Sequence, residues 1–189
     1  MVMLRRMASI AAAALLVSAC TSVIMTGQLH RANSNSFFNY WAGRGEMLAV
    51  VVGNPFPVSK EVLDRAVTDA MQGNHNGPLT RFSTDPGPKA DRNSRIVVAF
   101  DLPKTMHVRV LCENAAAIPT SGREAGKLRA DFAFCIESDI YSSVSASMPG
   151  VDSIGDPRFR QMIAGAMWSL IPAVDPLSSD QGQCIGPGC

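Results

Sequence analysis

Cysteine and histidine are the residues in this sequence whose side chains are best suited to chemistry. A cysteine can be acylated, oxidised to a disulfide or used as a nucleophile, and a histidine can bind a metal or move a proton. No two histidines stand at the spacing of metal ligands on a helix or a hairpin, so we predict no metal site and no cofactor. The residues concerned are Cys20, Cys112, Cys135, Cys184, Cys189, His30, His75 and His107.

Catalytic motifs are missing from the sequence as well. There is no Gly-x-Ser-x-Gly nucleophile elbow, no Walker loop and no Gly-x-Gly-x-x-Gly stretch. We interpret His75 as a solvated residue of a turn, His107 as a boundary residue at the start of a strand, and the serines at 142–147 as a solvated strand face. Cys112 is not expected to be a nucleophile, because a disulfide partner is available. We therefore predict that the protein is not an enzyme.

The first twenty residues have the layout of an export signal. A pair of arginines at positions 5 and 6 precedes an uncharged apolar run, and a small residue stands directly before a cysteine. The stretch Val17-Ser18-Ala19-Cys20 resembles the lipobox of bacterial lipoproteins. The resemblance ends at that cysteine, and the rest of the chain carries no motif of a named family.

The lipobox resemblance implies a membrane-anchored protein. A signal peptide of residues 1–19 would be cleaved between Ala19 and Cys20, and Cys20 would then carry a diacylglyceryl thioether and an acylated amino group. Three acyl chains make such an attachment effectively permanent. Thr21, in place of an aspartate, implies sorting to the outer membrane with the domain facing the periplasm, and an inner-membrane anchor is the alternative.

An uncleaved transmembrane segment is a second way to hold this chain in a membrane. No residue from Met7 to Leu29 is charged, and a bilayer requires about 20 predominantly apolar residues. From Cys20 onward, however, this stretch contains threonine, serine, glycine and glutamine, so its hydrophobicity is weak. The lipid anchor is therefore the favoured interpretation.

Assigning one cysteine to lipid leaves an even number of cysteines. In an oxidising compartment four cysteines form two disulfides, with three pairings possible, and the alternative is free buried thiols. One pairing follows from a predicted hairpin over residues 106–137, whose central turn places Cys112 directly opposite Cys135. The two remaining cysteines, Cys184 and Cys189, can close a small ring through a Gly-Pro-Gly bend.

The pattern of apolar residues predicts two amphipathic helices and several strands. Ser59 can cap a helix over residues 60–72, and Asp156 followed by Pro157 is a strong start for a helix that ends near residue 170. Apolar runs predict strands, in addition to the hairpin, at 47–52, 95–100 and 140–148. This order predicts an α+β fold, with a mostly antiparallel sheet of four to five strands and two amphipathic helices packed on one face.

Changes in composition along the chain indicate one folded domain between two less regular ends. An abrupt cluster of aromatic residues at 37–41 is expected to dock on the domain, with lipid headgroups as the alternative contact. A turn-rich loop at 73–94 is predicted to be functional or mobile. The predicted divisions are a signal peptide at 1–19, a lipidated N-terminus and tether at 20–45, a single domain at 46–174 and a C-terminal loop at 175–189.

Charge and composition exclude several classes of function. With 17 basic and 16 acidic residues and no basic block, the chain lacks the positive surface of a nucleic-acid-binding protein. An apolar content of 47% excludes a disordered chain. We therefore predict a periplasm-facing lipoprotein, bound to the membrane through Cys20, that acts as a non-enzymatic accessory or protein-interaction module with an envelope protein as its partner.

Two other classes of function stay open. One is a small-ligand or peptide-binding domain, and the other is an enzyme of unfamiliar type. A concave apolar pocket would favour the ligand-binding domain, whereas a flat patch with aromatic rim residues would favour the interaction module. Convergence of His75 or His107 with acidic residues in a cleft would favour an enzyme.

Overall fold

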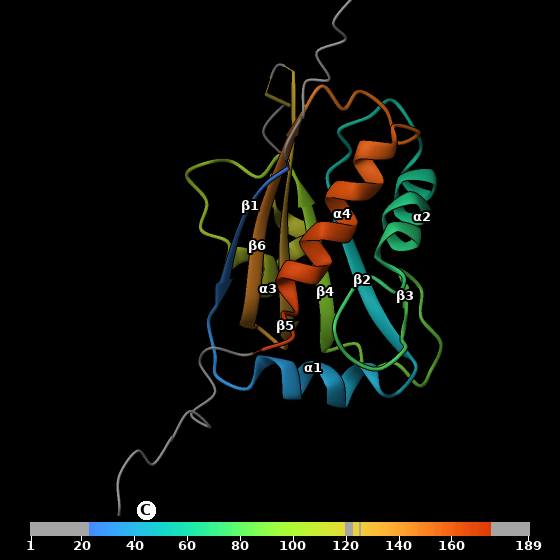
Figure 1. The fold of residues 1–189 in the computed structure, drawn as a ribbon, viewed down its shortest axis with the longest axis vertical. Coiled ribbons are helices and arrows are strands. Elements are labelled where there is room, and N and C mark those ends of the chain that lie inside the picture. Colours follow the sequence, from blue (N-terminus) through green and yellow to red (C-terminus); the bar gives the residue numbers. More distant parts are fainter. Residues whose placement is uncertain (1–22, 120–122, 125, 175–189) are drawn as a thin grey trace, which may run out of the picture.

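A six-stranded sheet forms the centre of the protein, and helices cover its two faces and one of its ends (Figure 1). The computed structural model describes residues 23–119, 123–124 and 126–174. The strand order is β1-β6-β5-β4-β2-β3. The strands are β1 (Ile24–Leu29), β2 (Glu46–Val52), β3 (Arg81–Ser83), β4 (Ser94–Phe100), β5 (Lys127–Ile136) and β6 (Asp139–Pro149). The helices are α1 (Ser34–Ala42), α2 (Lys60–Met71), α3 (Val110–Glu113) and α4 (Pro157–Leu170), with a 3-10 turn at Ala115–Ala117.

The structure has the predicted α+β class, but the sheet is larger and more mixed than predicted. β1, β6, β5 and β4 form antiparallel pairs, whereas β2 runs parallel to both β4 and β3. After β2 the chain passes through α2 before it forms either parallel partner, as a parallel pair requires a long crossover. The two edge strands, β1 and β3, raise the number of strands above the predicted four to five.

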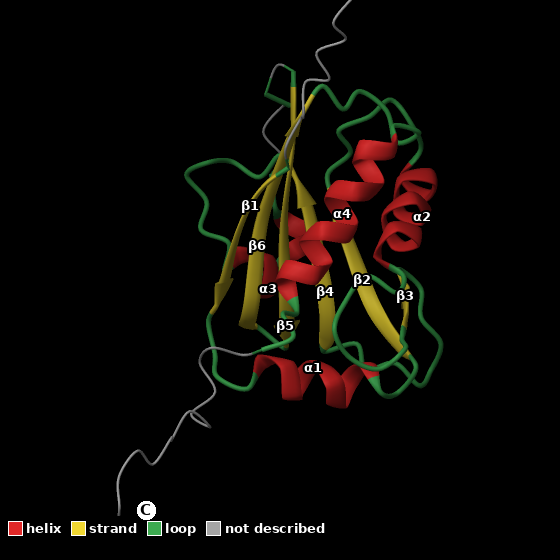
Figure 2. Cartoon of the chain, viewed as in Figure 1, coloured by secondary structure: helices red, strands yellow, loops and turns green. Residues whose placement is uncertain are grey.

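Both predicted amphipathic helices are present, as α2 and α4, and they lie on the same face of the sheet (Figure 2). The Ser59 hydroxyl accepts a hydrogen bond from the Val62 amide at 3.4 Å, and the Asp156 carboxylate accepts one from the Arg158 amide at 2.9 Å. These caps satisfy amides that the first turn of a helix leaves unpaired. The apolar faces of the helices pack on the sheet in a core that includes Leu63, Val67, Phe100, Phe132, Phe134, Phe159, Met162, Ile163 and Leu170.

The segment predicted as a tether at 20–45 contributes two elements to the domain. β1 pairs with β6 over its whole length, and α1 lies across the end of the sheet at which β1 finishes (Figure 1). Phe38 of α1 is fully buried in the main core. The predicted domain boundary at residue 46 is therefore corrected to the start of β1. The aromatic cluster docks on the domain through Phe38.

Both ends of the chain lie outside the described residues. The signal peptide at 1–19 and the lipid on Cys20 therefore stay predictions, as do the C-terminal loop at 175–189 and the pairing of Cys184 with Cys189. In the part of the chain that the structure describes, no helix combines the length and the apolar character needed to cross a bilayer.

The hairpin predicted over residues 106–137 is wrong in its first half. β5 pairs with β4 on one side and with β6 on the other. Residues 110–117 form α3 and the 3-10 turn instead, on the face of the sheet opposite α2 and α4. The continuous apolar run Val110-Leu111-Cys112 lacks the alternation of a strand with one wet face. Leu111, Cys112 and Ile118 pack there on β4 and β5 in a second, smaller core.

Candidate functional site

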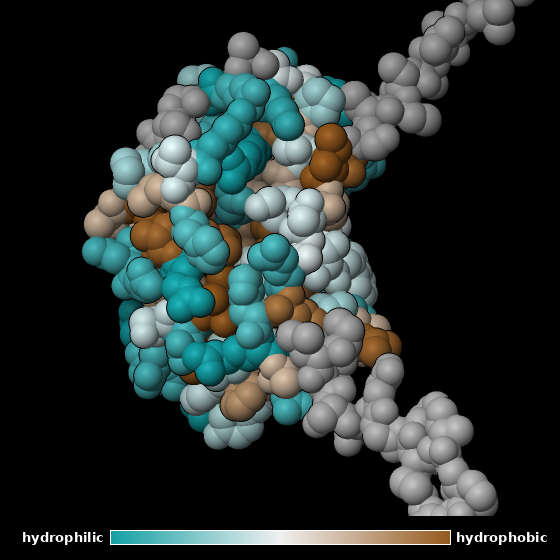
Figure 3. Space-filling view, turned by 90° about the vertical axis from the view of Figure 1, so that its left-hand side faces the viewer, coloured by the Kyte–Doolittle hydropathy of each residue, from teal (hydrophilic) through white to brown (hydrophobic). Residues whose placement is uncertain are grey.

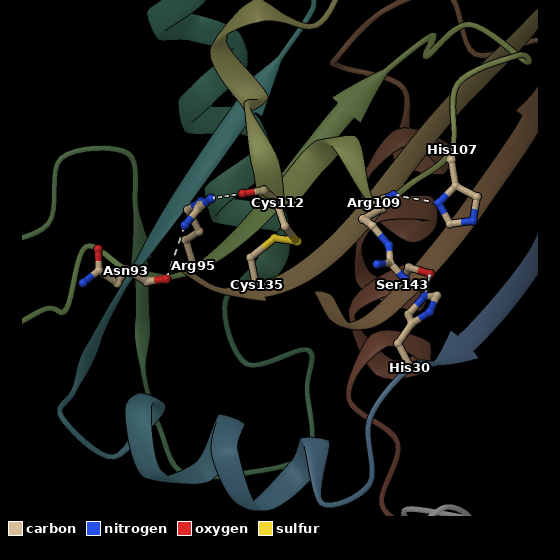
Figure 4. The surroundings of a disulfide bond; sticks show 8 residues. All are labelled: His30, Asn93, Arg95, His107, Arg109, Cys112, Cys135 and Ser143. Atoms are coloured by element: carbon tan, nitrogen blue, oxygen red, sulfur yellow. Dashed lines mark hydrogen bonds between the residues drawn. A yellow bond between two sulfur atoms is a disulfide. The ribbon is translucent and has the colours of Figure 1, made fainter. Parts of the chain in front are cut away.

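Cys112 and Cys135 form a disulfide, although they do not face each other in a hairpin. The bond joins α3 to β5, and the two Cα atoms are 5.4 Å apart. Both cysteines are buried, and the Arg95 guanidinium donates a hydrogen bond to the Cys112 carbonyl at 2.6 Å (Figure 4). The disulfide fastens the α3 segment to the sheet, and it holds the sulfur of Cys112 in a form that cannot act as a nucleophile.

A polar cavity of about 260 Å³ lies close to the start of α3. His30 lines this cavity, and its Nε2 atom is 2.8 Å from Ser143 Oγ. The side chain of Arg109 extends toward this pair (Figure 4). Three segments distant in the sequence therefore build one polar site, and its lining consists of His30, Arg31, Arg109, Glu113, Ser138, Asp139 and Ile140.

The charges around His30 differ from those in a serine hydrolase. Burial lowers the pKa of His30, and the positive charges of His107 and Arg109 lower it further. A hydrolytic triad instead places a carboxylate beside the histidine, which stabilises its protonated form. Ser143 lies in the middle of β6, where backbone amides pair with β1 and β5 rather than facing a reacting carbonyl oxygen. This arrangement suits contact with a ligand better than nucleophilic catalysis.

The serines of β6 are buried, which corrects their interpretation as a solvated strand face. β1 pairs along the outer edge of β6, so β6 has a neighbouring strand on each side. The side chain of Ser145 lies within hydrogen-bonding reach of the Asp131 carboxylate, which in turn pairs with Arg129 at 2.9 Å. The buried serines are Ser142, Ser143 and Ser147.

An aromatic groove of about 580 Å³ adjoins the polar cavity. Arg31, from the cavity lining, lies over the ring of Tyr141, with Cζ 5.5 Å from the ring centroid. Phe37 packs edge-on against the same ring at 5.0 Å, so Tyr141 connects the two spaces. We call this surface the aromatic groove, and it is lined by Asn33, Ser36, Phe37, Tyr40, Trp41, Ile136 and Tyr141.

The helix that carries most of the groove is firmly attached to the sheet. The Ser34 hydroxyl at the start of α1 donates a hydrogen bond to the Tyr141 carbonyl at 2.9 Å. Phe38, on the inner side of α1, packs edge-on against Phe134 at 5.6 Å. With that side buried, the helix presents Phe37 and Tyr40 outward, and their side chains are 43% and 62% exposed.

Unpaired arginines lie beside both spaces. The Arg44 guanidinium is 4.4 Å from the centroid of the Trp41 ring and 5.5 Å from that of Tyr40. Among the described residues, neither Arg44 nor Arg109 forms an ion pair with a carboxylate. Arg31 differs, because it pairs with Asp139 at 2.7 Å. The surroundings of the groove therefore hold two cationic groups that are available to a ligand.

A larger cleft of about 640 Å³ lies between α2 and β3, but its chemistry is less specific. Its walls are mainly charged residues of α2, such as Glu61, Asp64 and Asp69. Charged residues on the outer side of an amphipathic helix are normally solvated. Within the described ranges, no three His, Cys, Asp or Glu side chains are placed to hold a metal ion.

His75 is buried in the core, which corrects its interpretation as a solvated turn residue. Its ring packs edge-on against Phe38 at 5.2 Å and against Phe82 at 5.4 Å. Neither ring nitrogen makes a hydrogen bond of good geometry. Burial lowers the pKa of His75 from its ordinary value of 6.5, and the backbone of Asn76 has a smaller, opposite effect. His75 therefore belongs to the core rather than to a ligand site.

Replacing His75 with leucine is expected to remove part of the pH dependence of stability. Because the native pKa lies below the unfolded value of about 6.5, the unfolded chain binds the proton first as the pH falls. The contribution of His75 to the free energy of unfolding is thus fully present above pH 6.5. Below that pH it declines by at most ~1.4 kcal/mol per pH unit. Urea unfolding of the parent and of His75→Leu between pH 5 and 8 measures this difference. A slope in His75→Leu equal to that of the parent would contradict the prediction.

Sequence reasoning identified only part of the candidate site. The aromatic cluster at 37–41 was noticed, but Ile136 at the end of β5 and Tyr141 near the start of β6 lie about a hundred residues later in the chain. His30 was assigned to the tether and Ser143 to a solvated face. Strand pairing of β1 with β6 brings these two residues together, and the missing strand signal of β1 concealed that pairing.

Comparisons with known proteins find a distant likeness in fold. No family model matches the chain, and no curated protein matches it in sequence. Among solved structures, a single-substitution variant of the PelC dodecamer from Paraburkholderia phytofirmans is 12% identical, with a TM-score of 0.44 over 79% of this chain and 98% of that chain. A PelC dodecamer from the same organism is 11% identical, with a TM-score of 0.42 over 79% of this chain and 97% of that chain.

Proposed function

We propose that this protein is a cell-envelope lipoprotein whose domain binds a segment of a partner protein in the aromatic groove. The observation that carries the proposal is the exposure of Phe37 and Tyr40 on a helix whose other side is fixed in the core. Aromatic side chains are enriched at the centres of protein interfaces, and groups held in place before binding lose little entropy on binding. A groove lined in this way suits the apolar side chains of an extended segment.

The position of the groove relative to the predicted anchor supports a protein partner. β1 begins at the opposite end of the sheet from α1 (Figure 1), and Cys20 precedes Val23 by three residues, which span at most ~10 Å. The length of β1 separates that end of the sheet from α1 by about 20 Å. A lipid on Cys20 would thus hold the groove away from the bilayer, within reach of a partner in the periplasm.

The face of the protein that carries β1 is less suited to binding an apolar segment. On the face that carries β1, hydrophobic residues form separate small areas between hydrophilic ones (Figure 3). In the polar cavity the positive charges of Arg109 and His107 act on His30, whereas a hydrolase pairs its histidine with a carboxylate. The non-enzymatic role predicted from the sequence is therefore part of this proposal.

Selection from a random peptide library on the full-length protein, purified in detergent, tests the proposal. Selected peptides should lose about tenfold or more in affinity when Phe37 and Tyr40 are both replaced by alanine, because truncating interface aromatics removes well over ~1 kcal/mol. Trp168→Ala is the matched control, since it removes an aromatic ring with a similar exposure of 45% from α4. This control should bind the peptides as the parent does.

Two results would contradict a binding role for the groove. One is the selection of no peptide from the library. The other is the selection of peptides that bind the double variant, Trp168→Ala and the parent with equal affinity.

A further inference from the structure

We infer that the polar cavity binds an acidic side chain of the partner segment, next to the apolar residues that occupy the aromatic groove. This inference rests on the proposed function of the groove and adds to it the chemistry of the bound segment. The segment would carry an aspartate or glutamate, and its carboxylate would contact Arg109 and His30.

The cavity and the groove are lined by different residues, but a contact between two of those residues joins them. Arg31 lines the cavity, and its guanidinium lies over the ring of Tyr141, which lines the groove. The end of β5 contributes Ile136 to the groove, and the turn that follows contributes Ser138 to the cavity. A segment bound in the groove would therefore have to extend past Arg31 to place one of its side chains in the cavity.

Arg109 and His30, which we call the base of the cavity, bring one positive charge to a lining that also holds Arg31, Glu113 and Asp139. Arg109 and His107 both act on His30, and burial together with these two charges favours its neutral form. Of the two carboxylates in the lining, Asp139 is neutralised by Arg31 at 2.7 Å. Glu113 belongs to α3 and is exposed. The positive charge of Arg109 would therefore attract a ligand carboxylate at the base. The negative charge of Glu113, in the cavity lining, would repel it.

The groups at the base are held in place before any ligand arrives. The His30 amide donates a hydrogen bond to the Tyr141 carbonyl at 2.9 Å. Arg109 directly precedes α3, which the disulfide joins to β5, and its amide donates to His107 Nδ1 at 3.2 Å. Neutral His30 and the Ser143 hydroxyl share a hydrogen bond, which fixes the position of the His30 ring. Such an arrangement requires little reorganisation on binding.

The charges at the other side of the groove also favour an acidic segment. Arg44 stacks on Trp41 and Tyr40 at the rim, and it has no carboxylate partner among the described residues. An apolar segment with acidic residues beside it would thus be complementary to the groove and its surroundings. Complementary charges of this kind set the specificity and register of binding.

Peptides selected on the groove provide the probe for this inference. Each selected peptide is compared with analogues in which one Asp or Glu is changed to Asn or Gln, and with an analogue whose C-terminus is amidated. Replacing the critical acidic residue should weaken binding about tenfold or more, as expected for a charge-assisted hydrogen bond, and amidation should have no effect.

Variants of the protein should give effects of opposite sign. Arg109→Gln should weaken binding of the acidic peptide about tenfold and leave its neutral analogue unaffected. Glu113→Gln should strengthen binding of the acidic peptide, because it removes a like charge from the wall. Arg160→Gln is the matched control, since it removes an exposed arginine from the first turn of α4, at the far end of the sheet.

The outcomes separate this inference from the proposal on which it depends. If the peptides bind through Phe37 and Tyr40 but neither acidic substitution nor Arg109→Gln changes affinity, the inference is overturned and the groove proposal stands. If amidation alone abolishes binding, the carboxylate is a chain terminus, and the assignment to a side chain is wrong. If binding does not depend on Phe37 and Tyr40, the groove proposal itself fails.

Discussion

Replacing Phe38 with alanine is expected to lower the free energy of unfolding by about 3–5 kcal/mol. Its ring is fully buried and packs edge-on against Phe134 and His75, with centroid distances of 5.6 Å and 5.2 Å. Strand pairing on both sides of β5 limits how far Phe134 can move to fill the space left by the ring. Urea-induced unfolding followed by circular dichroism measures this loss.

Phe37 provides a matched control for that experiment, because it is the neighbouring phenylalanine on the same helix. Its ring is 43% exposed, so Phe37→Ala should lower the free energy of unfolding by only about 1 kcal/mol. Similar small losses in the two variants would show that α1 is not docked in the core. The tether predicted from the sequence would then be the better description of residues 20–45.

Removing the disulfide by replacing both Cys112 and Cys135 with alanine is expected to lower the free energy of unfolding by about 3 kcal/mol. The two cysteines are 23 positions apart in the sequence. A cross-link that closes a loop of this size reduces the entropy of the unfolded chain by roughly that amount. Unfolding of the double variant under non-reducing conditions measures this loss of free energy. The parent protein, unfolded in the presence of a reductant, should lose a similar amount.

Peptide mapping of the unreduced protein checks the pairing itself. The expected fragment joins the peptide of Cys112 to that of Cys135. A fragment that joins either of them to Cys184 or Cys189 would contradict the structure, and it would place the C-terminal residues beside α3.

Elements whose signal lies within one short segment could be predicted from the sequence. α2 and α4 have apolar residues at helical spacing and a capping residue at the start, and β2, β4 and β6 are continuous apolar or alternating runs. β1 and β3 have no such signal. Thr26, Gly27 and Gln28 interrupt β1, and β3 has three residues. Both are ordered by pairing with a neighbouring strand, which no local pattern reveals.

Strand pairing was predicted less well than the strands, for the same reason. The simplest prediction pairs β5 with the segment before the nearest turn, as the two strands of a hairpin. In the structure, β5 pairs with β4 and β6 instead. The pairing of Cys112 with Cys135 was nevertheless correct, because α3 packs on β5 and brings the first cysteine over the second. The aromatic groove and the polar cavity depend on these long-range pairings, so they could be recognised only in part.

β1 has a consequence for the order in which the domain folds. It is the first strand of the chain, and its partner residues in β6 run from Ser142 to Ser147. Almost the whole domain must therefore be synthesised before β1 can join the sheet, and pairing across so long a stretch is slow. Until then the strand nearest the predicted lipid has an unpaired backbone, which can associate with other chains. We expect this protein to be most prone to aggregate during export and early folding, rather than after it has folded.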